Sequence, residues 1–575
     1  MDEPRRSDVS LRQLIVAASL IALLIFLGPV ALRIPLTDPD EGFHASIAQE
    51  MVERGDWVTP RFQGEAFFDK PILFTWAQAL SLKLLGMNED AVRLPGLLFG
   101  LAAMLATGVV GWRIFGPRAG VLAAMLYATM VLPTVLAQLA VHDVALVPFA
   151  ALATLLFWEA DRASGFRTKA GLAVTIGVLL GLSCLTKGFV GVGLVGVSYG
   201  SYLLVTRRLS LEACVRGAAA LAIAGLIALP WYLAMEARNP GYLHYYFVER
   251  HLLGFATESQ RHGGEPWWYY LPIILSGGLP WILYLPVAVR DWWERRKGES
   301  RRPGESRFPG DGGTTLLWCW FLACTVLLSA AGSKLVTYIW PVFPPVAVLA
   351  AAVWARLLDG ELSQPAFEWF GRCFAPIGWI GPLLLPLSLP VLNRVLGLPV
   401  PWYAVVLAVL VGLSAWIPAR LWSKRRLAQA LPAGVLVPAA HMLFVLAFVL
   451  PHLATQHNAK DLAEYFNRRG RLPGEVVLVE QRVGSVVFYL KPELRRRLTI
   501  DQFRGQRADE LRPRPGAQPD TVYVVEEEHV GEVAERLNLR PGWRRVGRHC
   551  VHEPDRAIFR TPRLVAESSA AWTWK

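Results

Sequence analysis

The sequence has little charge for its length. Only 18% of its 575 residues are Asp, Glu, Lys or Arg, whereas 54% are hydrophobic and 22 are Trp. An average soluble domain is far less apolar, so the composition excludes a soluble globular protein and predicts an integral membrane protein. The net charge of +12 would suggest nucleic-acid binding in a soluble chain. In a membrane protein, the basic residues of cytoplasmic loops explain this charge and imply no nucleic acid.

Cysteine is also scarce, and the six cysteines form no recognisable site. The sequence contains no CxxC pair and no Cys/His metal pattern, and five of the six cysteines lie in or beside apolar segments. They therefore imply neither a disulfide framework nor a zinc site. An internal repeat of fixed period is missing too, which weakens the case for a transporter built from inverted repeats.

Long apolar segments dominate what is present. A transmembrane helix needs about 20 such residues, and the first segment is too long for a signal peptide and has no cleavage site, so we expect it to be retained. About thirteen segments qualify: residues 14–32, 91–112, 119–138, 143–159, 170–187, 188–206, 216–236, 267–289, 314–332, 335–356, 373–393, 402–422 and 433–453. The shorter run 72–86 is expected to lie on or dip into the interface. The predicted fold class is an α-helical polytopic membrane protein.

Basic residues fall in every second connection between these segments. They are Arg5, Arg6 and Arg12; Arg113 and Arg118; Arg162, Arg167 and Lys169; Arg207 and Arg208; Arg290, Arg295, Arg296, Lys297, Arg301, Arg302 and Arg307; and Lys424, Arg425 and Arg426. The positive-inside rule makes these connections and the N-terminus cytoplasmic. An odd number of spans then places the C-terminus outside. Residues 299–313, rich in Gly, Pro, Ser and Arg, are expected to form a disordered cytoplasmic loop.

The composition changes after about residue 456. Strand-like runs at 476–480 and 521–526 alternate with helical stretches around 483–490 and 530–537, a pattern typical of an α/β domain. We therefore predict a membrane domain over residues 1–455, with long outer loops at 36–71 and 237–266. A small extracytoplasmic α/β domain is predicted over residues 456–575.

The first outer loop opens with three acids, Asp38, Asp40 and Glu41. They make a good helix start, with Asp38 as N-cap, Pro39 as the first helical residue and Glu41 as the capping-box acid. The same carboxylates suit acid–base chemistry at a membrane face. Local signals do not decide between capping and catalysis.

Apolar residues follow these acids at helical spacing. Phe43, Ile47 and Met51 recur every four residues, which predicts an amphipathic helix lying along the membrane surface. Near the end of the loop an acid and a base, Asp69 and Lys70, stand side by side.

Other charged residues interrupt apolar runs at the outer ends of predicted spans. Charges at such positions are costly and are candidates for function. Asp143, which follows His142, either caps the next helix or does chemistry, and Lys187 either snorkels to the interface or binds an anion. Arg250 either pairs with an acid such as Glu249 or faces a phosphate.

The predicted topology brings these groups to one face. Carboxylates suit general-base catalysis, and cations suit a phosphate leaving group whose negative charge grows in the transition state. The carboxylates are Asp40, Glu41 and Asp143, and the cations are Lys70, Lys187 and Arg250. A divalent metal is a further candidate cofactor, because Asp40, Glu41, His44, His142 and Asp143 include its ligand types.

Several motifs along the chain resemble the GT-C class of membrane glycosyltransferases, in particular the bacterial lipid A aminoarabinose transferases and the protein O-mannosyltransferases. The matching motifs are Asp40-Glu41, FFDKPILFTW at 67–76, VRLP at 92–95, His142-Asp143, LTKG at 185–188 and SKLVTYIWP at 333–341. Their order and spacing over several hundred residues carry the resemblance.

The resemblance implies an inner-membrane enzyme that transfers a sugar from undecaprenyl phosphate to an extracytoplasmic acceptor such as lipid A, another envelope glycan or a protein. It implies Asp40 as the general base and Asp143 as a second important acid. It also implies that Lys70, with Arg250 or a neighbouring residue as its basic partner, holds the donor phosphate and that Tyr338 lies near the lipid. The outer α/β domain would then cover the cavity.

Departures from the family pattern leave the sugar and the acceptor open. Phe43 and His44 follow the acidic pair where a basic and then an aromatic residue are common, and Asp69 replaces a Glu before Lys70. A lipid or polysaccharide translocase and a non-catalytic scaffold are the alternatives. Neither explains why acids and bases gather at one face beside an outer α/β domain.

Overall fold

The structure divides into two compact units. The computed structural model describes residues 9–28, 34–253, 265–298, 311–373, 402–424, 426–451, 454, 457–479, 484–499, 502–507, 511, 521–526, 529–537, 543–546 and 549–552. The first unit, here the membrane unit, comprises Met1–Leu32, Phe68–Phe74 and Arg93–Leu450. The second unit comprises Arg33–Phe67, Thr75–Val92 and Pro451–Lys575. The predicted span 373–393 and the predicted loop 299–313 lie almost wholly outside the described residues.

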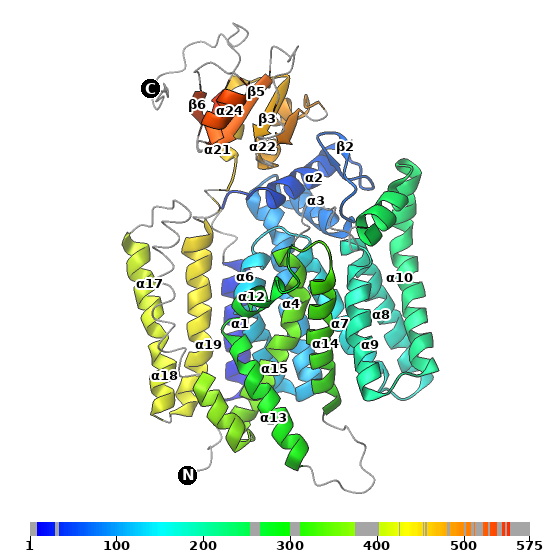
Figure 1. Ribbon diagram of the computed structural model, residues 1–575, viewed down its shortest axis with the longest axis vertical. Coiled ribbons are helices and arrows are strands. Elements are labelled where there is room, and N and C mark those ends of the chain that lie inside the picture. The colour runs from blue at the N-terminus through cyan, green and yellow to red at the C-terminus, as the bar shows by residue number, and fades with distance from the viewer. Residues whose placement is uncertain are drawn as a thin grey trace. The chain divides into compact units, whose positions relative to one another are not determined.

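Helices make up the membrane unit (Figure 1). They are α1 (Leu11–Ala22) continued by the π-helix η1 (Leu23–Leu27), α4 (Glu89–Phe115, whose first residues belong to the second unit), α5 (Pro117–Ala128), α6 (Val131–Ala137), α7 (Asp143–Ala160), α8 (Phe166–Lys187), α9 (Val190–Thr206), α10 (Leu211–Arg238), η3 (His244–Leu253), α12 (Tyr270–Gly277), η4 (Trp281–Tyr284), α13 (Leu285–Gly298), α14 (Asp311–Ala330), η5 (Val336–Val342), α15 (Phe343–Asp359), α17 (Trp402–Ser414), α18 (Trp416–Ser423), α19 (Leu427–Phe444) and η6 (Val445–Val449).

Within the described residues, eight helices are long and apolar enough to cross a membrane, or ten if two bent pairs each count as one span. Two further predicted spans, 14–32 and 188–206, correspond to the shorter apolar helices Leu11–Leu27 and Val190–Thr206. The chain is a polytopic helical membrane protein, as predicted. The predicted interfacial run 72–86 forms α3 (Leu73–Leu85).

Two spans predicted as continuous are broken, which corrects the sequence prediction. The span 119–138 bends by 67° between α5 and α6, and the span 267–289 bends by 96° between α12 and the helix that begins at Trp281. Hydroxyl groups support the first break: Thr134 donates to the free carbonyl of Ala128 at 2.8 Å, and the hydroxyl of Thr129 accepts from the indole of Trp281 at 2.8 Å. Hydropathy misses such breaks because buried side chains satisfy the freed backbone.

Small residues allow the membrane helices to approach closely. On α8, a Cβ atom added at Gly177 would lie 2.6 Å from Cβ of Ile223, and one added at Gly181 would lie 2.7 Å from Cβ of Ile227. Ile223 and Ile227 belong to α10. Because lipid provides no hydrophobic drive between helices, such close backbone packing is a main source of their association.

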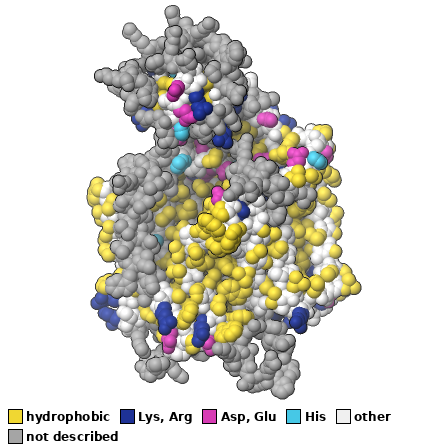
Figure 2. All heavy atoms as spheres, in the orientation of Figure 1, with side chains coloured by type: hydrophobic (Ala, Val, Ile, Leu, Met, Phe, Trp, Pro, Cys, Tyr) yellow, Lys and Arg dark blue, Asp and Glu magenta, His cyan; other side chains and the backbone are white. Residues whose placement is uncertain are grey.

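Ion pairs join the helices at one end of the membrane unit. The pairs are Arg113–Glu159, Arg118–Asp359, Arg356–Asp291 and Arg216–Asp161. Figure 2 shows Lys, Arg, Asp and Glu side chains along this lower edge, below flanks covered by hydrophobic side chains. Glu159 and Asp161 lie at the end of α7, whereas Asp143 is its first residue, so Asp143 lies about 27 Å away at the opposite end.

The second unit contains a five-stranded sheet. Its order is β4-β3-β5-β7-β6, with β3 parallel to β4 and β5 and with β7 antiparallel to β5 and β6. The strands are β3 (Glu475–Val479), β4 (Phe503–Gln506), β5 (Thr521–Glu526), β6 (Trp543–Val546) and β7 (His549–His552); the helices are α2 (Asp40–Arg54), α21 (Lys460–Arg469), α22 (Ser485–Tyr489), α23 (Pro492–Arg495) and α24 (Val530–Leu537), and a hairpin joins β1 (Arg61–Phe62) to β2 (Glu65–Ala66). The two predicted strands are confirmed as β3 and β5. The three other strands of the sheet were missed because they are short and polar.

Helix α2 packs against α22 of the same unit. The predicted helix is confirmed as α2, but Ile47 and Met51 are buried in protein, so these two apolar residues do not face a membrane as predicted. A Cβ atom added at Gly42 would lie 2.5 Å from Cβ of Ser485, and one added at Gly484 would lie 2.3 Å from Cα of Phe43. Two glycines thus permit the contact between the helices, a feature that periodicity does not reveal.

Candidate functional site

A buried ion pair forms the centre of the candidate site in the membrane unit. Asp143 is the first residue of α7 and Lys187 is the last of α8, and these two helices pack along each other. The ammonium of Lys187 pairs with the carboxylate of Asp143, and each residue is 8% exposed. The structure therefore brings together two residues that the sequence identified separately. Asp143 makes no side-chain cap for α7, whose N-cap is His142.

The short helix η5 covers this pair. Lys187 Nζ lies 3.7 Å from the ring centroid of Tyr338, a cation–π distance, and the side chain of Thr337 lies near the carboxylate of Asp143. The hydroxyl of Tyr270 donates to the carbonyl of Leu335 at 3.2 Å, which holds the segment that leads into η5. Sequence reasoning did not identify Thr337, although it lies within the matched 333–341 motif.

Lys70 is the second cation of the site. It is partly buried and lies within electrostatic range of Tyr338, Asp143, Arg250 and Asp69. Burial acts to lower the pKa of the Lys70 ammonium, but the neighbouring acidic groups, Tyr338 first and then Asp143, raise it above its ordinary value. Lys70 therefore carries its full positive charge at neutral pH.

Arg250 supplies the third cation from η3. Its guanidinium lies 3.6 Å from the carboxylate of Asp69, and the hydroxyl of Tyr245 donates to the same carboxylate at 2.5 Å. Glu249 lies instead 3.3 Å from the imidazole of His244. The acid beside Arg250 is thus Asp69 and not Glu249, the acid that the sequence suggested by name.

The charges of the site do not balance. Among the described residues, three cations (Lys70, Lys187 and Arg250) and two carboxylates (Asp69 and Asp143) share one electrostatic neighbourhood, which gives these groups a formal charge of 3 − 2 = +1. A phosphate diester carries one negative charge and would neutralise it. Partly buried cations of this kind favour a phosphate whose charge increases as a bond to it breaks.

The three acids before and within α2 lie in the second unit. Asp38 is not the N-cap, because Pro39 holds that position and makes no side-chain cap. Instead, the carboxylate of Asp38 accepts from the backbone N–H of Ser485 at 2.9 Å and from its hydroxyl. Burial raises the pKa of Asp38 to about 7, although hydrogen bonds from Ser485 and Gly484 oppose the shift.

Glu41 and Asp40 differ in their surroundings. Glu41 is 2% exposed, and its carboxylate accepts from the backbone N–H and the hydroxyl of Thr37 at 2.8 and 3.1 Å. It therefore stabilises the turn before α2. This role resembles that of the predicted capping-box acid, but the donor is Thr37 and not Asp38. Asp40, the first residue of α2, is exposed.

The metal candidates are distributed over both units. Asp40, Glu41 and His44 belong to the second unit and His142 to the membrane unit. His44 is buried near the ring of Phe67, with the ring centroids 5.8 Å apart. Across the part of the chain that the structure describes, no three His, Cys, Asp or Glu side chains come together as a metal site.

Comparisons with known proteins identify relatives of this chain. Residues 69–233 match the family model of dolichyl-phosphate-mannose-protein mannosyltransferase. The undecaprenyl phosphate-alpha-4-amino-4-deoxy-L-arabinose arabinosyl transferase of Edwardsiella ictaluri is 34% identical over 371 residues, which are 64% of each chain. The transferase of the same name from Aeromonas salmonicida is 33% identical over 367 residues, 63% of this chain and 64% of that protein.

The fold has solved counterparts. The crystal structure of ArnT from Cupriavidus metallidurans bound to undecaprenyl phosphate superposes with a TM-score of 0.70 at 21% identity, covering 93% of this chain and 97% of that one. Sequence similarity to the curated relatives spans just under two thirds of their length. The structural superposition, by contrast, covers nearly the whole of both chains. The chain is thus similar in sequence and in fold to the aminoarabinose transferases named above, in agreement with the resemblance seen in its motifs.

Proposed function

We propose that the chain is a membrane glycosyltransferase that moves a sugar, aminoarabinose-like or a hexose, from undecaprenyl phosphate to an extracytoplasmic acceptor. The observation that carries this proposal is the cluster of Lys70, Lys187 and Arg250, with Asp69 and Asp143, at one end of the membrane helices. Its formal charge of +1 suits a sugar phosphodiester, and the named relatives act on or bind undecaprenyl phosphate.

The reaction is a displacement at the anomeric carbon of the sugar. The acceptor oxygen forms a bond to that carbon while the bond from the carbon to the phosphate oxygen breaks, so the configuration inverts. The bonding electrons leave with undecaprenyl phosphate, whose charge rises from about −1 towards −2. Lys70 and Arg250 stabilise this added charge. If the acceptor is a hydroxyl, its proton passes to Asp40.

Asp143 and Lys187 act together in this proposal. Their buried pair and the ring of Tyr338 fix the position of the Lys187 ammonium, so Lys187 adds positive potential at the phosphate without free movement. Asp143 keeps both Lys187 and Lys70 charged. Glu41, which holds the turn before α2, positions Asp40 as its chain neighbour.

The setting that fits this chemistry is a bacterial inner membrane. The N-terminus would be cytoplasmic and residues 456–575 would form an extracytoplasmic domain, because the basic connections alternate along the chain. The acceptor would be lipid A, another envelope glycan or a protein. The translocase alternative has no support among the relatives reported above, which are transferases, and the charges of the site gather at one end of the helices.

Mass spectrometry of envelope lipids and glycans tests the proposal. Cells that express the intact chain should carry a sugar-sized mass on one acceptor that is missing from cells without it. Lys70→Met at equal expression should lower that product about 100-fold or more, the magnitude expected for one preorganised electrostatic contact.

Lys83→Met is the matched control, because Lys83 lies on the exposed side of α3 close to Lys70 in the chain. It should leave the product unchanged. Identical envelope profiles with and without the intact chain would refute the transferase proposal. Equal amounts of product from the two lysine variants would refute only the role of Lys70 and would leave the transferase proposal standing.

A further inference from the structure

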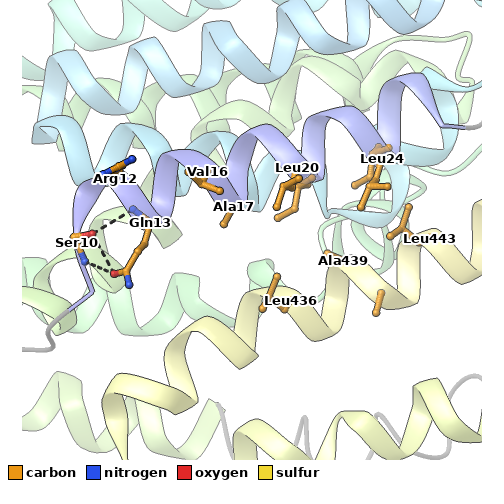
Figure 3. Close-up of a pocket in the computed structure, with 13 residues that line it drawn as sticks. Ser10, Arg12, Gln13, Val16, Ala17, Leu20, Leu24, Leu436, Ala439 and Leu443 are labelled. Carbon is orange, nitrogen blue, oxygen red and sulfur yellow. Dashed lines mark hydrogen bonds between the residues drawn. The ribbon is translucent and has the colours of Figure 1, made fainter.

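An apolar groove separates α1 from α19 within the membrane unit. Its volume is about 750 Å³, and its walls come from α1 with η1 on one side and α19 on the other. Figure 3 shows Leu20 of α1 and Leu24 of η1 facing Leu436, Ala439 and Leu443 of α19. Aliphatic side chains from two membrane helices thus form a hydrophobic channel along the helix axes.

The groove is open because the two helices touch only near one end. Helix α19 packs against η1, and in Figure 3 the helices diverge from Leu24 and Leu443 towards Ser10. Leu20, Leu24 and Leu436 remain 53%, 47% and 53% exposed. The lining runs from Ser10 to Ile25, which is about 22 Å at the helical rise. One leaflet of hydrocarbon is roughly 15 Å thick, half of the bilayer core, so the groove accommodates a complete acyl chain.

The wide end of the groove is polar and basic. Ser10, Arg12 and Gln13 line it, and the amide oxygen of Gln13 accepts both the backbone N–H and the hydroxyl of Ser10. Among the described residues the amide nitrogen of Gln13 has no acceptor, so it is available as a donor to a ligand. This end lies on the side of the ion pairs described above, because Arg118 donates to the carbonyl of Val9 at 3.5 Å.

Cations accumulate at the same end. Lys424 and Arg426 precede α19 as Ser10 precedes α1, and the two helices run in the same direction along the groove (Figure 3). All three cations, Arg12, Lys424 and Arg426, are exposed. Within the described part of the chain none of them has a carboxylate partner in an ion pair. An anionic headgroup is therefore the complementary ligand.

We infer that this groove binds one anionic phospholipid, with an acyl chain between α1 and α19 and the phosphate against Arg12 and Gln13. The site is distinct from the candidate donor site, since Asp143 lies at the opposite end of the helices. A lipid bound in the groove would connect α19 to α1 along the length of the groove, in addition to the direct contact at η1. The lipid is thus a structural ligand that does not enter the transfer reaction.

Native mass spectrometry tests this site. The full chain is reconstituted in nanodiscs of equal parts phosphatidylcholine and phosphatidylglycerol and extracted in detergent, and the lipids that remain bound are counted. The intact protein should retain one phosphatidylglycerol per chain in preference to phosphatidylcholine. Leu20→Trp, which fills the groove, and Arg12→Ala, which removes a headgroup contact, should each lower retention about tenfold, the change expected for one charge-assisted contact.

Two control variants isolate the groove. Leu226→Trp alters another exposed leucine, 74% exposed on α10, and Arg167→Ala removes an exposed arginine at the start of α8. Both should retain phosphatidylglycerol like the intact protein. Equal retention by Leu20→Trp and Leu226→Trp would overturn the site, and equal retention of the two phospholipids would overturn the anionic preference. Preferential retention of undecaprenyl phosphate, when it is added in equal amount, would assign the groove to a polyprenyl lipid instead.

Discussion

Charged residues do different work in the two units of this protein. In the membrane unit, Lys187 and Asp143 neutralise each other in a buried pair, and Lys70 shares their neighbourhood. In the second unit, Asp38 binds Ser485 and Glu41 binds Thr37, while Asp40 between them is exposed. In the membrane unit, a buried charge is thus stabilised by a charge of opposite sign. Around the start of α2, two carboxylates are stabilised by hydrogen bonds from uncharged donors, and the third carboxylate is exposed to solvent.

The largest effect is expected at the accessible acid. Asp40→Asn should lower the rate of sugar transfer to a hydroxyl acceptor by about 10²- to 10⁴-fold, the range for loss of a general base, with no change in folding. The assay is transfer from synthetic undecaprenyl-phosphate sugar in proteoliposomes. Asp461→Asn is the matched control, since Asp461 is an exposed acid in the first turn of α21 in the same unit. Near-normal turnover by Asp40→Asn would remove the base assignment.

In the membrane unit, the next largest effect is expected at the buried pair of Lys187 and Asp143. Lys187→Met leaves the Asp143 carboxylate buried without its ammonium, which should cost about 3–5 kcal/mol of stability. The double variant with Asp143→Asn should recover most of that stability without recovering transfer. Thermal unfolding in detergent measures the stability of each variant, and the proteoliposome assay measures transfer. The exposed pair Lys169–Glu212 is the control, because solvent screens its charges and breaking it should leave the stability nearly unchanged. A double variant no more stable than Lys187→Met would contradict the paired-charge account.

Much of the fold was predictable because its signals are local. Apolar length identified the helices that the structure describes as membrane spans, and the strands β3 and β5 followed from their apolar runs. The breaks after Ala128 and before Trp281 were not predictable, because the Thr134 hydroxyl binds a freed carbonyl across the first break and the indole of Trp281 binds the hydroxyl of Thr129, 152 residues away in the sequence. The same limitation hid β4, β6 and β7, whose polar strands pair only in the context of the sheet.

The candidate site was predictable to a similar degree. Asp143, Lys187, Lys70 and Arg250 stood out because charge is rare in an apolar chain, and the structure brings all four into one cluster. The capping role assigned to Asp38 was wrong, since its partner Ser485 lies 447 residues away in the sequence. No local pattern predicts a contact of that length, and only the small residues Gly42 and Gly484 hinted at close packing.

Close packing between α2 and α22 leaves no room for a side chain at Gly42. Gly42→Ala should destabilise the second unit by about 1–3 kcal/mol, because the new methyl group would overlap Ser485. Hydrogen exchange of the β3 and β5 amides in the full chain measures this loss. Gly531→Ala on α24 meets no atom within 4 Å, so as a matched control it should stabilise by up to about 1 kcal/mol. Unchanged exchange in Gly42→Ala would show that α2 adjusts without cost.

The smallest effect is expected from the titration of Asp38. Its pKa is about 7 in the folded protein against a model value of 3.8, so the folded chain binds more protons than the unfolded chain between these values. Stability should therefore be greatest below about pH 4 and should fall as the pH rises towards 7. Solvent around this partly exposed carboxyl limits the change to on the order of 1 kcal/mol. Asp38→Asn keeps an acceptor and a donor for Ser485 but cannot titrate. In this variant, the protection of the β3 amides against hydrogen exchange, corrected for intrinsic exchange, should therefore lose this part of its pH dependence. The same slope in both proteins would assign the titration to another group and would leave Asp38 as a purely structural acceptor.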